Sequence, residues 1–434
     1  MQSPTHIRSP ILWLPTELRF RILCELKPRD LVAFCSTCRV ARAHIIDQLL
    51  WRSAHLLVFD DPFITWSSLT PTARAMNAHR ESSWDWFLST RSRYTLLNAL
   101  KKGERTEKSL SVNLYADVLL GLVETANAEA PETGNPAWPS NGGSANIALL
   151  ADLVDKHRRG VEAQAIHDYL SHSDYPSEAN DTLGEWPVRP ITRSMTRLIY
   201  PTDAASRLHL LYGLTHREAH SRFARCEARQ LVYDWSSVSE ATDFGPFRPD
   251  GNINWQLLEA VGSLMGHNLP RLALRDRDRT TFPRGLRYVL PHRIPIDPAL
   301  PGDWAGITGS WLGTYGFLDY RQLHFYNMDR AHRRAELEEF EEEVGQLMEL
   351  ELKLSEDLAS DRKLTFGLPI CKDLPILYFE GQSKMRRAMP TQYPQALIGV
   401  RGCVALVPDG KTVRWMFIIR YILDDATTAP FILR

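Results

Sequence analysis

Cys35 and Cys38 lie three positions apart, and His44 follows them. Cysteine and histidine are the residue types that most often bind zinc. A structural zinc site needs four ligands, usually from two paired clusters, and the chain has no second Cys-x-x-Cys. Both cysteines also fall on the apolar side of a predicted helix. This pattern favours core packing over metal binding, and we expect no metal and no other cofactor.

Motifs that indicate catalysis are absent from the sequence. It contains no Gly-x-Ser-x-Gly, no P-loop, no Rossmann glycine string and no His-Glu-x-x-His. The glycines of residues 306–310 (GITGS) have the wrong spacing for a nucleophile elbow. We therefore expect a non-catalytic protein. A site assembled in three dimensions from histidines and carboxylates stays open as an alternative.

Residues 271–293 are rich in arginine, a residue type that binds phosphate or acidic peptides. Asp276 and Asp278 dilute this charge, however, and the acidic run 336–357 can neutralise it within the fold. Structural neutralisation is favoured over recognition of an external anion.

Aromatic residues next to glycines mark the C-terminal part of the chain, namely Trp311, Tyr315 and Trp415, with Arg414 beside the last. Such aromatics commonly fill the interior of a β-barrel. Because aromatic residues also dominate interaction hot spots, these four residues are the candidate substrate-binding set.

Composition sets the class of protein. Among 434 residues, 51 Lys and Arg balance 52 Asp and Glu, so no global charge favours nucleic acid or an anionic membrane as a partner. Six scattered cysteines fit a reducing compartment. The N-terminus lacks the layout of a signal peptide, and the most apolar runs, near Leu114–Val123 and Trp415–Leu423, are too short to span a membrane. We expect an intracellular protein of the cytoplasm, the nucleus or both.

The elements that carry these residues begin with a compact helical segment at residues 11–51. Leu14, Leu18, Ile22 and Leu26 recur at four-residue steps after Pro15, which suits a first helical turn. Pro28 must end this helix, and Asp30 is placed to cap the next one. Two further apolar faces follow: Leu31, Phe34, Cys35 and Cys38, then Ile45, Ile46, Leu49, Leu50 and Trp51.

Three helices this short cannot bury all of these side chains among themselves. A unit of about forty residues is marginally stable alone, so the surplus apolar surface indicates a partner or a neighbouring domain.

The combination of Leu14-Pro15-x-Glu17-Leu18 with Ile22-Leu23, Leu26, Asp30-Leu31 and Leu50-Trp51-Arg52 resembles the F-box. In that family, the box binds the Skp-type adaptor of an SCF ubiquitin ligase. The resemblance therefore implies an adaptor-binding set, which is Leu14, Pro15, Leu18, Ile22, Leu23, Leu26, Leu31, Phe34, Cys35, Leu50 and Trp51.

The rest of the chain is similar to fungal F-box proteins, through Phe244–Gly251 (FGPFRPDG) and Trp255, and to barrels of F-box-only proteins, through Trp311–Gly316. Phe317-Leu318-Asp319 departs from the His-Gly pair that often follows in those barrels. The resemblance implies an α+β fold. Its parts are an F-box (11–55), a mainly helical middle (56–270) with a loop at 126–146, and a C-terminal antiparallel, barrel-like β-domain (300–434).

Alternation predicts β-strands in that last part, at Ser310–Tyr315, Gln322–Tyr326, Leu374–Glu380, Gly399–Val407 and Val413–Tyr421. Pro408–Lys411 predicts a hairpin turn, since Gly410 tolerates positive φ. Heptad-like spacing predicts an acidic helix inserted at Ala335–Leu358.

The resemblance implies a substrate-recognition subunit of an SCF-type ligase, which binds the adaptor and through it a cullin, together with an unknown protein substrate. Two alternatives remain, an F-box-bearing scaffold without a role in ubiquitination and a small-molecule enzyme that uses the β-domain.

Overall fold

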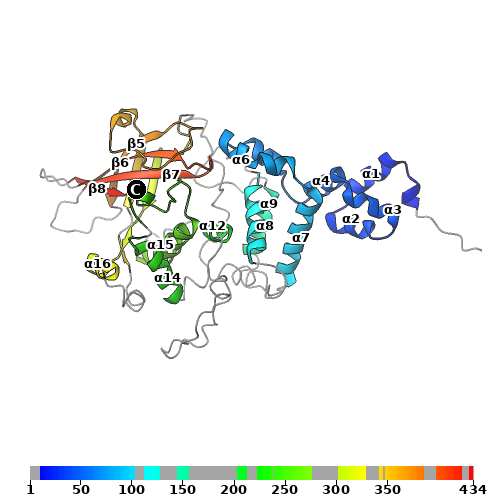
Figure 1. Cartoon of the computed structure of the whole chain (residues 1–434), viewed down its shortest axis with the longest axis horizontal. Coiled ribbons are helices and arrows are strands. Elements are labelled where there is room, and N and C mark those ends of the chain that lie inside the picture. The colour runs from blue at the N-terminus through cyan, green and yellow to red at the C-terminus, as the bar shows by residue number, and fades with distance from the viewer. Residues whose placement is uncertain are drawn as a thin grey trace, which may run out of the picture. The chain divides into compact units, whose positions relative to one another are not determined.

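The computed structural model describes residues 10–102, 112–127, 144–155, 203–212, 222–236, 238–275, 302–328, 342–345, 348–385, 397–422 and 430–433. The chain divides into two compact units. The first comprises Met1–Ser68, Asn77–Glu129 and Asn141–Ala165, and the second comprises Leu69–Met76, Ala130–Ser140 and Ile166–Arg434. Helices make up the described part of the first unit, and the second combines helices with an antiparallel sheet (Figure 1). The mixed α+β prediction is confirmed.

Short helices form the N-terminal segment of the first unit. They are η1 (Pro10–Trp13), α1 (Thr16–Cys24), α2 (Pro28–Cys35), α3 (Arg39–Arg42), η2 (Ala43–Ile46) and α4 (Gln48–Leu56). Pro15 is the N-cap of α1, and Pro28 occupies the first turn of α2, where its missing N–H leaves no donor unpaired.

Two details of this segment differ from the prediction. Because α2 already begins at Pro28, Asp30 lies inside its first turn and does not cap it. The predicted third helix is interrupted at Asp47, whose carboxylate accepts hydrogen bonds from the N–H groups of Leu49 (3.1 Å) and Leu50 (3.2 Å). This side chain caps α4 and so separates it from η2.

The next helices along the chain are α5 (Pro62–Ser67), α6 (Pro71–Ser82), α7 (Trp86–Lys102), α8 (Val112–Glu124) and α9 (Ala145–Asp155). In the first unit, Asp60 is buried and accepts hydrogen bonds from the N–H groups of Asn127 (2.9 Å) and Ala145 (2.9 Å) and from the Ser144 hydroxyl (2.6 Å). One carboxylate thus ties the end of α4 to the start of α9. Residues 128–143 of the predicted loop lie outside the described residues.

The helices of the second unit are α12 (Asp203–Tyr212), α14 (Arg222–Tyr233), η4 (Glu240–Thr242), α15 (Trp255–Arg275), α16 (Tyr320–Met328) and η6 (Glu356–Ser360). Both α12 and α14 pack against the long helix α15 (Figure 1). Phe247 and Ile253, which precede α15, bury their side chains against Val407 at the end of a strand.

Six antiparallel strands form the sheet of this unit, in the order β1-β4-β5-β6-β7-β8. They are β1 (Gly309–Gly313), β4 (Met348–Leu354), β5 (Leu377–Met385), β6 (Leu397–Leu406), β7 (Val413–Ile422) and β8 (Pro430–Leu433), while β2 (Gly316–Phe317) and β3 (Glu343–Val344) form a separate pair. Within the described residues no strand pair joins β1 to β8, so the predicted barrel-like domain is an antiparallel sheet that does not close.

The hairpin between β6 and β7 has the predicted turn. Gly410 has a φ of 68°, a conformation that glycine adopts without strain. The register runs without a break from Leu397 opposite Ile422 to Leu406 opposite Val413. Both strands were predicted within a few residues of their observed bounds.

Two predicted elements of this unit are wrong. The acidic helix expected at Ala335–Leu358 is replaced from Glu343 onward by β3, β4 and η6, and residues 335–341 lie outside the described residues. In β4, Met348, Leu350, Leu352 and Leu354 alternate with charged residues, and this two-residue period overrides the heptad spacing.

The strand expected at Gln322–Tyr326 is the helix α16. The carboxylate of Asp319 accepts a hydrogen bond from the N–H of Arg321 (2.9 Å) and so caps the first turn. Leu323 and Tyr326, three positions apart, then pack against Leu318 and Cys226, as an amphipathic helix requires.

Among the described residues, no helix has the length and apolar character needed to cross a membrane.

Candidate functional site

The N-terminal helices bury a core of their own. Leu23, Leu31, Leu50 and Trp51 are at most 1% exposed, as is Cys35, and Trp86 of α7 packs against them. The Trp51 indole N–H donates a 2.8 Å hydrogen bond to the Ile45 carbonyl.

Five members of the predicted adaptor-binding set are therefore core residues: Leu23, Leu31, Cys35, Leu50 and Trp51. They shape the surface from beneath and do not present side chains on it. The reason is that Trp86 and Phe87 of α7 pack against these residues, and the ring centroids of Trp51 and Phe87 are 4.9 Å apart. Helix α7 therefore covers an apolar face of the N-terminal helices that we expected to be exposed.

Other members of the set do reach the surface. Leu18 and Ile22 stand four residues apart on α1 and are 49% and 42% exposed. Pro15 is exposed as well, while Leu14, Leu26 and Phe34 are half-buried. The outer face of α1 is thus apolar although the core beneath it is already filled.

The predicted adaptor-binding set leaves out several exposed apolar side chains of the same segment, which are Trp13 (67%), Val32 (47%), Val40 (55%), Ile46 (81%) and Leu49 (67%). A signal for one of them was present. Leu49, Leu50 and Trp51 of α4 together span about 200° of the helix surface, so all three cannot face one core. Leu50 and Trp51 are the buried members of the three.

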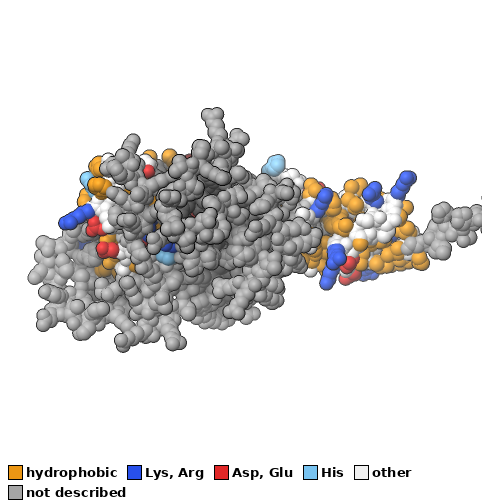
Figure 2. All heavy atoms as spheres, turned by 90° about the horizontal axis from the view of Figure 1, so that it is seen from below, with side chains coloured by type: hydrophobic (Ala, Val, Ile, Leu, Met, Phe, Trp, Pro, Cys, Tyr) orange, Lys and Arg blue, Asp and Glu red, His pale blue; other side chains and the backbone are white. Residues whose placement is uncertain are grey.

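Basic residues lie among these apolar ones. Residues 11–53 contain seven Lys and Arg against four Asp and Glu, and the exposed cations include Arg21, Lys27, Arg29 and Arg42. Figure 2 shows a face of this segment covered largely by hydrophobic side chains, with Lys and Arg between them. The surface suits an apolar partner with an acidic border.

The two cysteines considered for zinc have different environments. Cys35 is buried in the core, and burial raises the pKa of its thiol. Cys38 is exposed, contrary to the prediction that it packs on an apolar face, because α2 ends at Cys35. Its sulfur accepts a hydrogen bond from the Ala41 N–H (3.4 Å), which lowers the pKa of Cys38. Within the described ranges, no cluster of His, Cys, Asp or Glu could hold a metal ion.

A buried polar cluster fixes α4 against α7 and α8. The ring of His55 bonds the Thr90 hydroxyl (2.8 Å) through Nδ1 and faces Arg93 (3.3 Å) through Nε2. Arg93 also donates to the Thr125 hydroxyl (2.8 Å). Burial, assisted by the Arg93 charge, lowers the pKa of His55 to about 3, and burial lowers that of Arg93 to about 10. His55 is therefore neutral at physiological pH.

In the second unit, the structure brings two of the predicted substrate residues together. The indoles of Trp311 (39% exposed) and Trp415 are 5.2 Å apart in an edge-on arrangement. Trp415 also stacks on Phe417 at 5.8 Å, above the buried Phe379. Tyr315 is 42% exposed and stacks on Phe317.

Arg414 does not belong to this aromatic group. It points to the opposite face of β7, is 3% exposed and forms a buried ion pair with Asp243. The rings of Phe247 (4.3 Å) and Phe366 (5.0 Å) flank its guanidinium. The prediction failed because residues 243–247 and 364–366 cover a face of the sheet that the sequence pattern left exposed.

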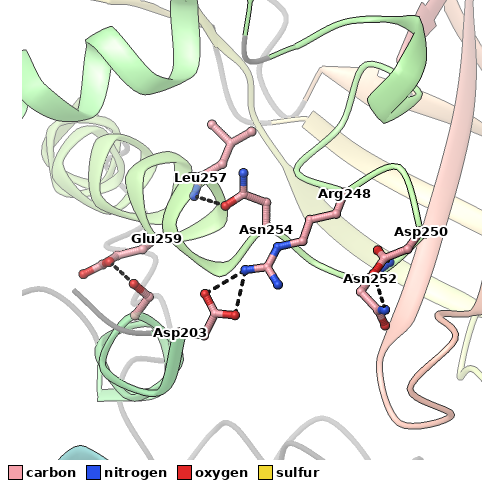
Figure 3. A network of polar contacts seen from close by, with 8 residues as sticks. Asp203, Arg248, Asp250, Asn252, Asn254, Leu257 and Glu259 are labelled. Atoms are coloured by element: carbon pink, nitrogen blue, oxygen red, sulfur yellow. Dashed lines mark hydrogen bonds and ion pairs between the residues drawn. The ribbon is translucent and has the colours of Figure 1, made fainter. Parts of the chain in front are cut away.

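The segment around Phe244–Gly251 has a structural role (Figure 3). Arg248 binds both carboxylate oxygens of Asp203 on α12 at 2.9 and 2.7 Å, and the side-chain oxygen of Asn254 accepts a hydrogen bond from the Leu257 N–H (3.2 Å) to cap α15. Glu259 of α15 bonds Ser206 (2.6 Å) on α12. These contacts join α12 to α15. The arginine-rich stretch 271–293 lies outside the described residues beyond Arg275.

Comparison with known proteins gives one positive finding. Residues 11–53 match the family model of the F-box domain. No curated protein and no solved structure shows a significant match to the chain.

Proposed function

The chain is an F-box protein, because residues 11–53 form an F-box domain, and from this premise we propose that it is a substrate-recognition subunit of an SCF-type ubiquitin ligase. F-box domains bind the Skp-type adaptor of such ligases. In the proposed arrangement, the box (11–55) binds the adaptor and through it the cullin, and the C-terminal domain (300–434) binds a protein substrate.

The observation that carries this proposal is the apolar surface left on a box whose core is complete. Leu18, Ile22 and Leu49 remain exposed although Leu23, Leu50 and Trp51 are buried beneath them. Burying a Leu or Ile side chain fully is worth about 1.5–3 kcal/mol. The exposed apolar side chains of the box can therefore together offset an association cost of about 4–15 kcal/mol. They are the seven residues Trp13, Leu18, Ile22, Val32, Val40, Ile46 and Leu49.

The proposed contribution to ubiquitination is proximity. A receptor that holds a substrate close to a ubiquitin-conjugating enzyme raises the effective concentration of its lysines and makes or breaks no bond itself. We accordingly propose a non-catalytic, intracellular protein. All six cysteines are free thiols, as a reducing compartment would keep them.

Adaptor binding is tested with the double variant Leu18→Ala/Ile22→Ala, measured by co-purification and by titration with the purified adaptor. We expect affinity to fall about tenfold or more, because apolar anchors dominate interface energetics. Leu88→Ala, which removes an equally exposed leucine from α7, is the matched control and should bind normally. An unchanged affinity in the double variant would count against the proposal.

Substrate recognition needs a second experiment. Proteins captured by the intact chain and by Leu18→Ala/Ile22→Ala are compared in cells treated with a proteasome inhibitor. A substrate should be captured by both chains but carry ubiquitin only with the intact one. A captured partner whose ubiquitination does not depend on the box would instead favour a scaffold.

A further inference from the structure

The charges of the box are unevenly distributed along the chain. The stretch from Lys27 to Ile46, which comprises α2, α3 and η2, has a single carboxylate side chain, that of Asp30. Its four cations are Lys27, Arg29, Arg39 and Arg42. Over the whole chain, by contrast, 51 Lys and Arg balance 52 Asp and Glu. The excess of positive charge is therefore a local property of this stretch.

The side chains of the four cations are all exposed, and none of them forms an ion pair within the residues that the structure describes. Burial and the charge of Asp30 raise the pKa of Tyr94, so the Asp30 carboxylate lies near α7. The next carboxylate along the chain, that of Asp47, caps α4. On α3 itself, no Asp or Glu accompanies Arg39 and Arg42.

Two other arginines of the box do have acidic neighbours. Arg52 binds Asp61 at 3.2 Å. Arg21 of α1 is four residues from both Glu17 and Glu25, which is the spacing at which opposite charges attract each other along a helix. The uncompensated positive charge is therefore concentrated between Lys27 and Arg42.

Exposed apolar side chains accompany these cations. On α2, Val32 (47% exposed) follows Arg29 by three positions, so the two side chains lie on the same side of the helix. On α3, Val40 (55% exposed) stands between Arg39 and Arg42 in the chain. Figure 2 shows Lys and Arg side chains among the hydrophobic ones on this segment. A partner that covers the apolar side chains must therefore come within reach of the cations.

We propose that Lys27, Arg29, Arg39 and Arg42 attract carboxylates at the border of the adaptor's apolar binding site. The four cations set the rate of association, and the apolar side chains of the box set the lifetime of the complex. This inference rests on the proposed function and deepens it, because it names the chemistry of the partner's surface and adds four residues to the adaptor-binding set.

The two roles follow from the distances over which charges and apolar side chains act. At physiological ionic strength, charges interact through water over about 8–10 Å, so exposed cations attract an acidic partner before contact. Apolar side chains stabilise only the complex that has formed. Substituting an exposed charge at the border of an interface accordingly changes the association rate and its salt dependence. Because the four cations have no ion pair within the described residues, none has to be broken when the adaptor binds.

The test uses stopped-flow mixing of the full-length chain with the purified Skp-type adaptor, at NaCl concentrations from about 50 to 500 mM. For the unmodified chain, we expect the association rate constant to fall steeply as salt is added. The variant Lys27→Gln/Arg29→Gln/Arg39→Gln/Arg42→Gln should associate about tenfold more slowly at the lowest salt and should depend less on salt. Its dissociation rate constant should change by less than about twofold.

The matched control neutralises four exposed cations of the second unit, so the net charge of the chain changes equally. It is Arg321→Gln/Arg362→Gln/Lys363→Gln/Lys372→Gln, which should associate like the unmodified chain. Circular dichroism checks that both variants are folded. An unchanged association rate in the box variant, an equal loss in the control, or association that does not depend on salt would overturn the proposal.

The failure of this inference is distinguishable from the failure of the proposed function. Leu18→Ala/Ile22→Ala should dissociate faster and associate at nearly the unmodified rate. Tight binding with the same association rate in every chain would overturn the role of the cations and leave adaptor binding in place. An unmodified chain that does not bind the adaptor at any salt concentration would overturn both.

Discussion

Arg414 on β7 and Asp243, 171 positions earlier in the chain, form an ion pair in which both side chains are at most 3% exposed. The carboxylate also accepts a hydrogen bond from the Gly367 N–H (3.2 Å). This pair fastens the segment before α15 to the sheet. Removing one partner leaves the other buried without a counter-charge, so the stability of the second unit should be sensitive to substitution of either residue.

We expect Asp243→Asn to lower the free energy of unfolding by about 3–5 kcal/mol, since it leaves the guanidinium buried without its counter-charge. Asparagine tolerates the positive φ of 50° at this position, so charge is the main change. Urea unfolding monitored by circular dichroism measures the loss. Asp203→Asn breaks the exposed pair with Arg248 (42% and 46% exposed) and should cost below about 1 kcal/mol. Equal losses in the two variants would contradict this assignment.

The box should respond differently to substitutions at its core and on its surface. Leu23 is fully buried, so Leu23→Ala should destabilise the first unit by about 2–5 kcal/mol. Leu18→Ala, one and a half turns away on α1, should leave unfolding nearly unchanged and weaken only adaptor binding. Denaturation of both variants, together with adaptor titration, separates the two effects. A Leu18→Ala variant that unfolds as readily as Leu23→Ala would show that Leu18 belongs to the core.

His55 makes stability depend on pH. In the folded chain its pKa is lowered to about 3, whereas an unfolded histidine takes up a proton near pH 6.5, so the unfolded state binds more protons below that pH. The contribution of His55 to the free energy of unfolding is therefore fully present above about pH 6.5 and is lost as the pH falls towards 3. Between pH 7 and pH 5 the loss should be about 2 kcal/mol.

The control for this pH dependence is His55→Gln, which keeps a polar side chain beside Thr90 but does not titrate. The unmodified chain should lose more stability than this variant between pH 7 and pH 5, as measured by urea midpoints at each pH. Parallel curves for the two chains would refute the role of His55.

Gly402 of β6 allows close packing within the sheet. A Cβ atom at this position would lie 2.4 Å from the ring of Phe379 and 2.2 Å from the Met416 carbonyl oxygen. Gly402→Ala should therefore cost about 1–3 kcal/mol through overpacking. Gly302→Ala, where a Cβ meets nothing within 4 Å, is the matched control and should be close to neutral in thermal unfolding. A neutral Gly402→Ala would mean that the Phe379 ring and the backbone at Met416 both move aside freely.

The sequence predicted elements well where local chemistry and packing agree. In the β6–β7 hairpin, alternation and the turn glycine Gly410 give the same answer, and α1 follows from Pro15 and its apolar steps. Prediction from the sequence failed where a helical and a strand-like spacing of apolar residues overlap. Leu337, Phe340, Val344 and Leu347 have the heptad-like spacing that predicted a helix, whereas Met348, Leu350, Leu352 and Leu354 of β4 alternate as in a strand. The aromatics of α16 favour a strand by propensity, and the cap from Asp319 decides for a helix.

The candidate site was harder to predict than the fold, because sequence does not show which later segment covers an apolar face. The sequence does not show which residues pack against Leu23 and Leu31. The structure shows that Trp86 of α7 covers them. Arg414 was placed among the aromatics for the same reason, since its partner Asp243 lies far away in the chain. Leu18 and Ile22 were predicted as adaptor-binding residues, which stays a prediction, and only the structure shows that their side chains are exposed.

Strand β7 carries packed side chains on both of its faces, Trp415 and Phe417 on one and Arg414 and Met416 on the other. Inserting one residue at the Gly410 turn would shift the pairing of β7 and exchange these faces. The guanidinium would then face Phe379, and an indole would face the carboxylate of Asp243. The length of this hairpin is therefore fixed by the two cores together, and an insertion or deletion between Leu406 and Val413 would disturb both of them.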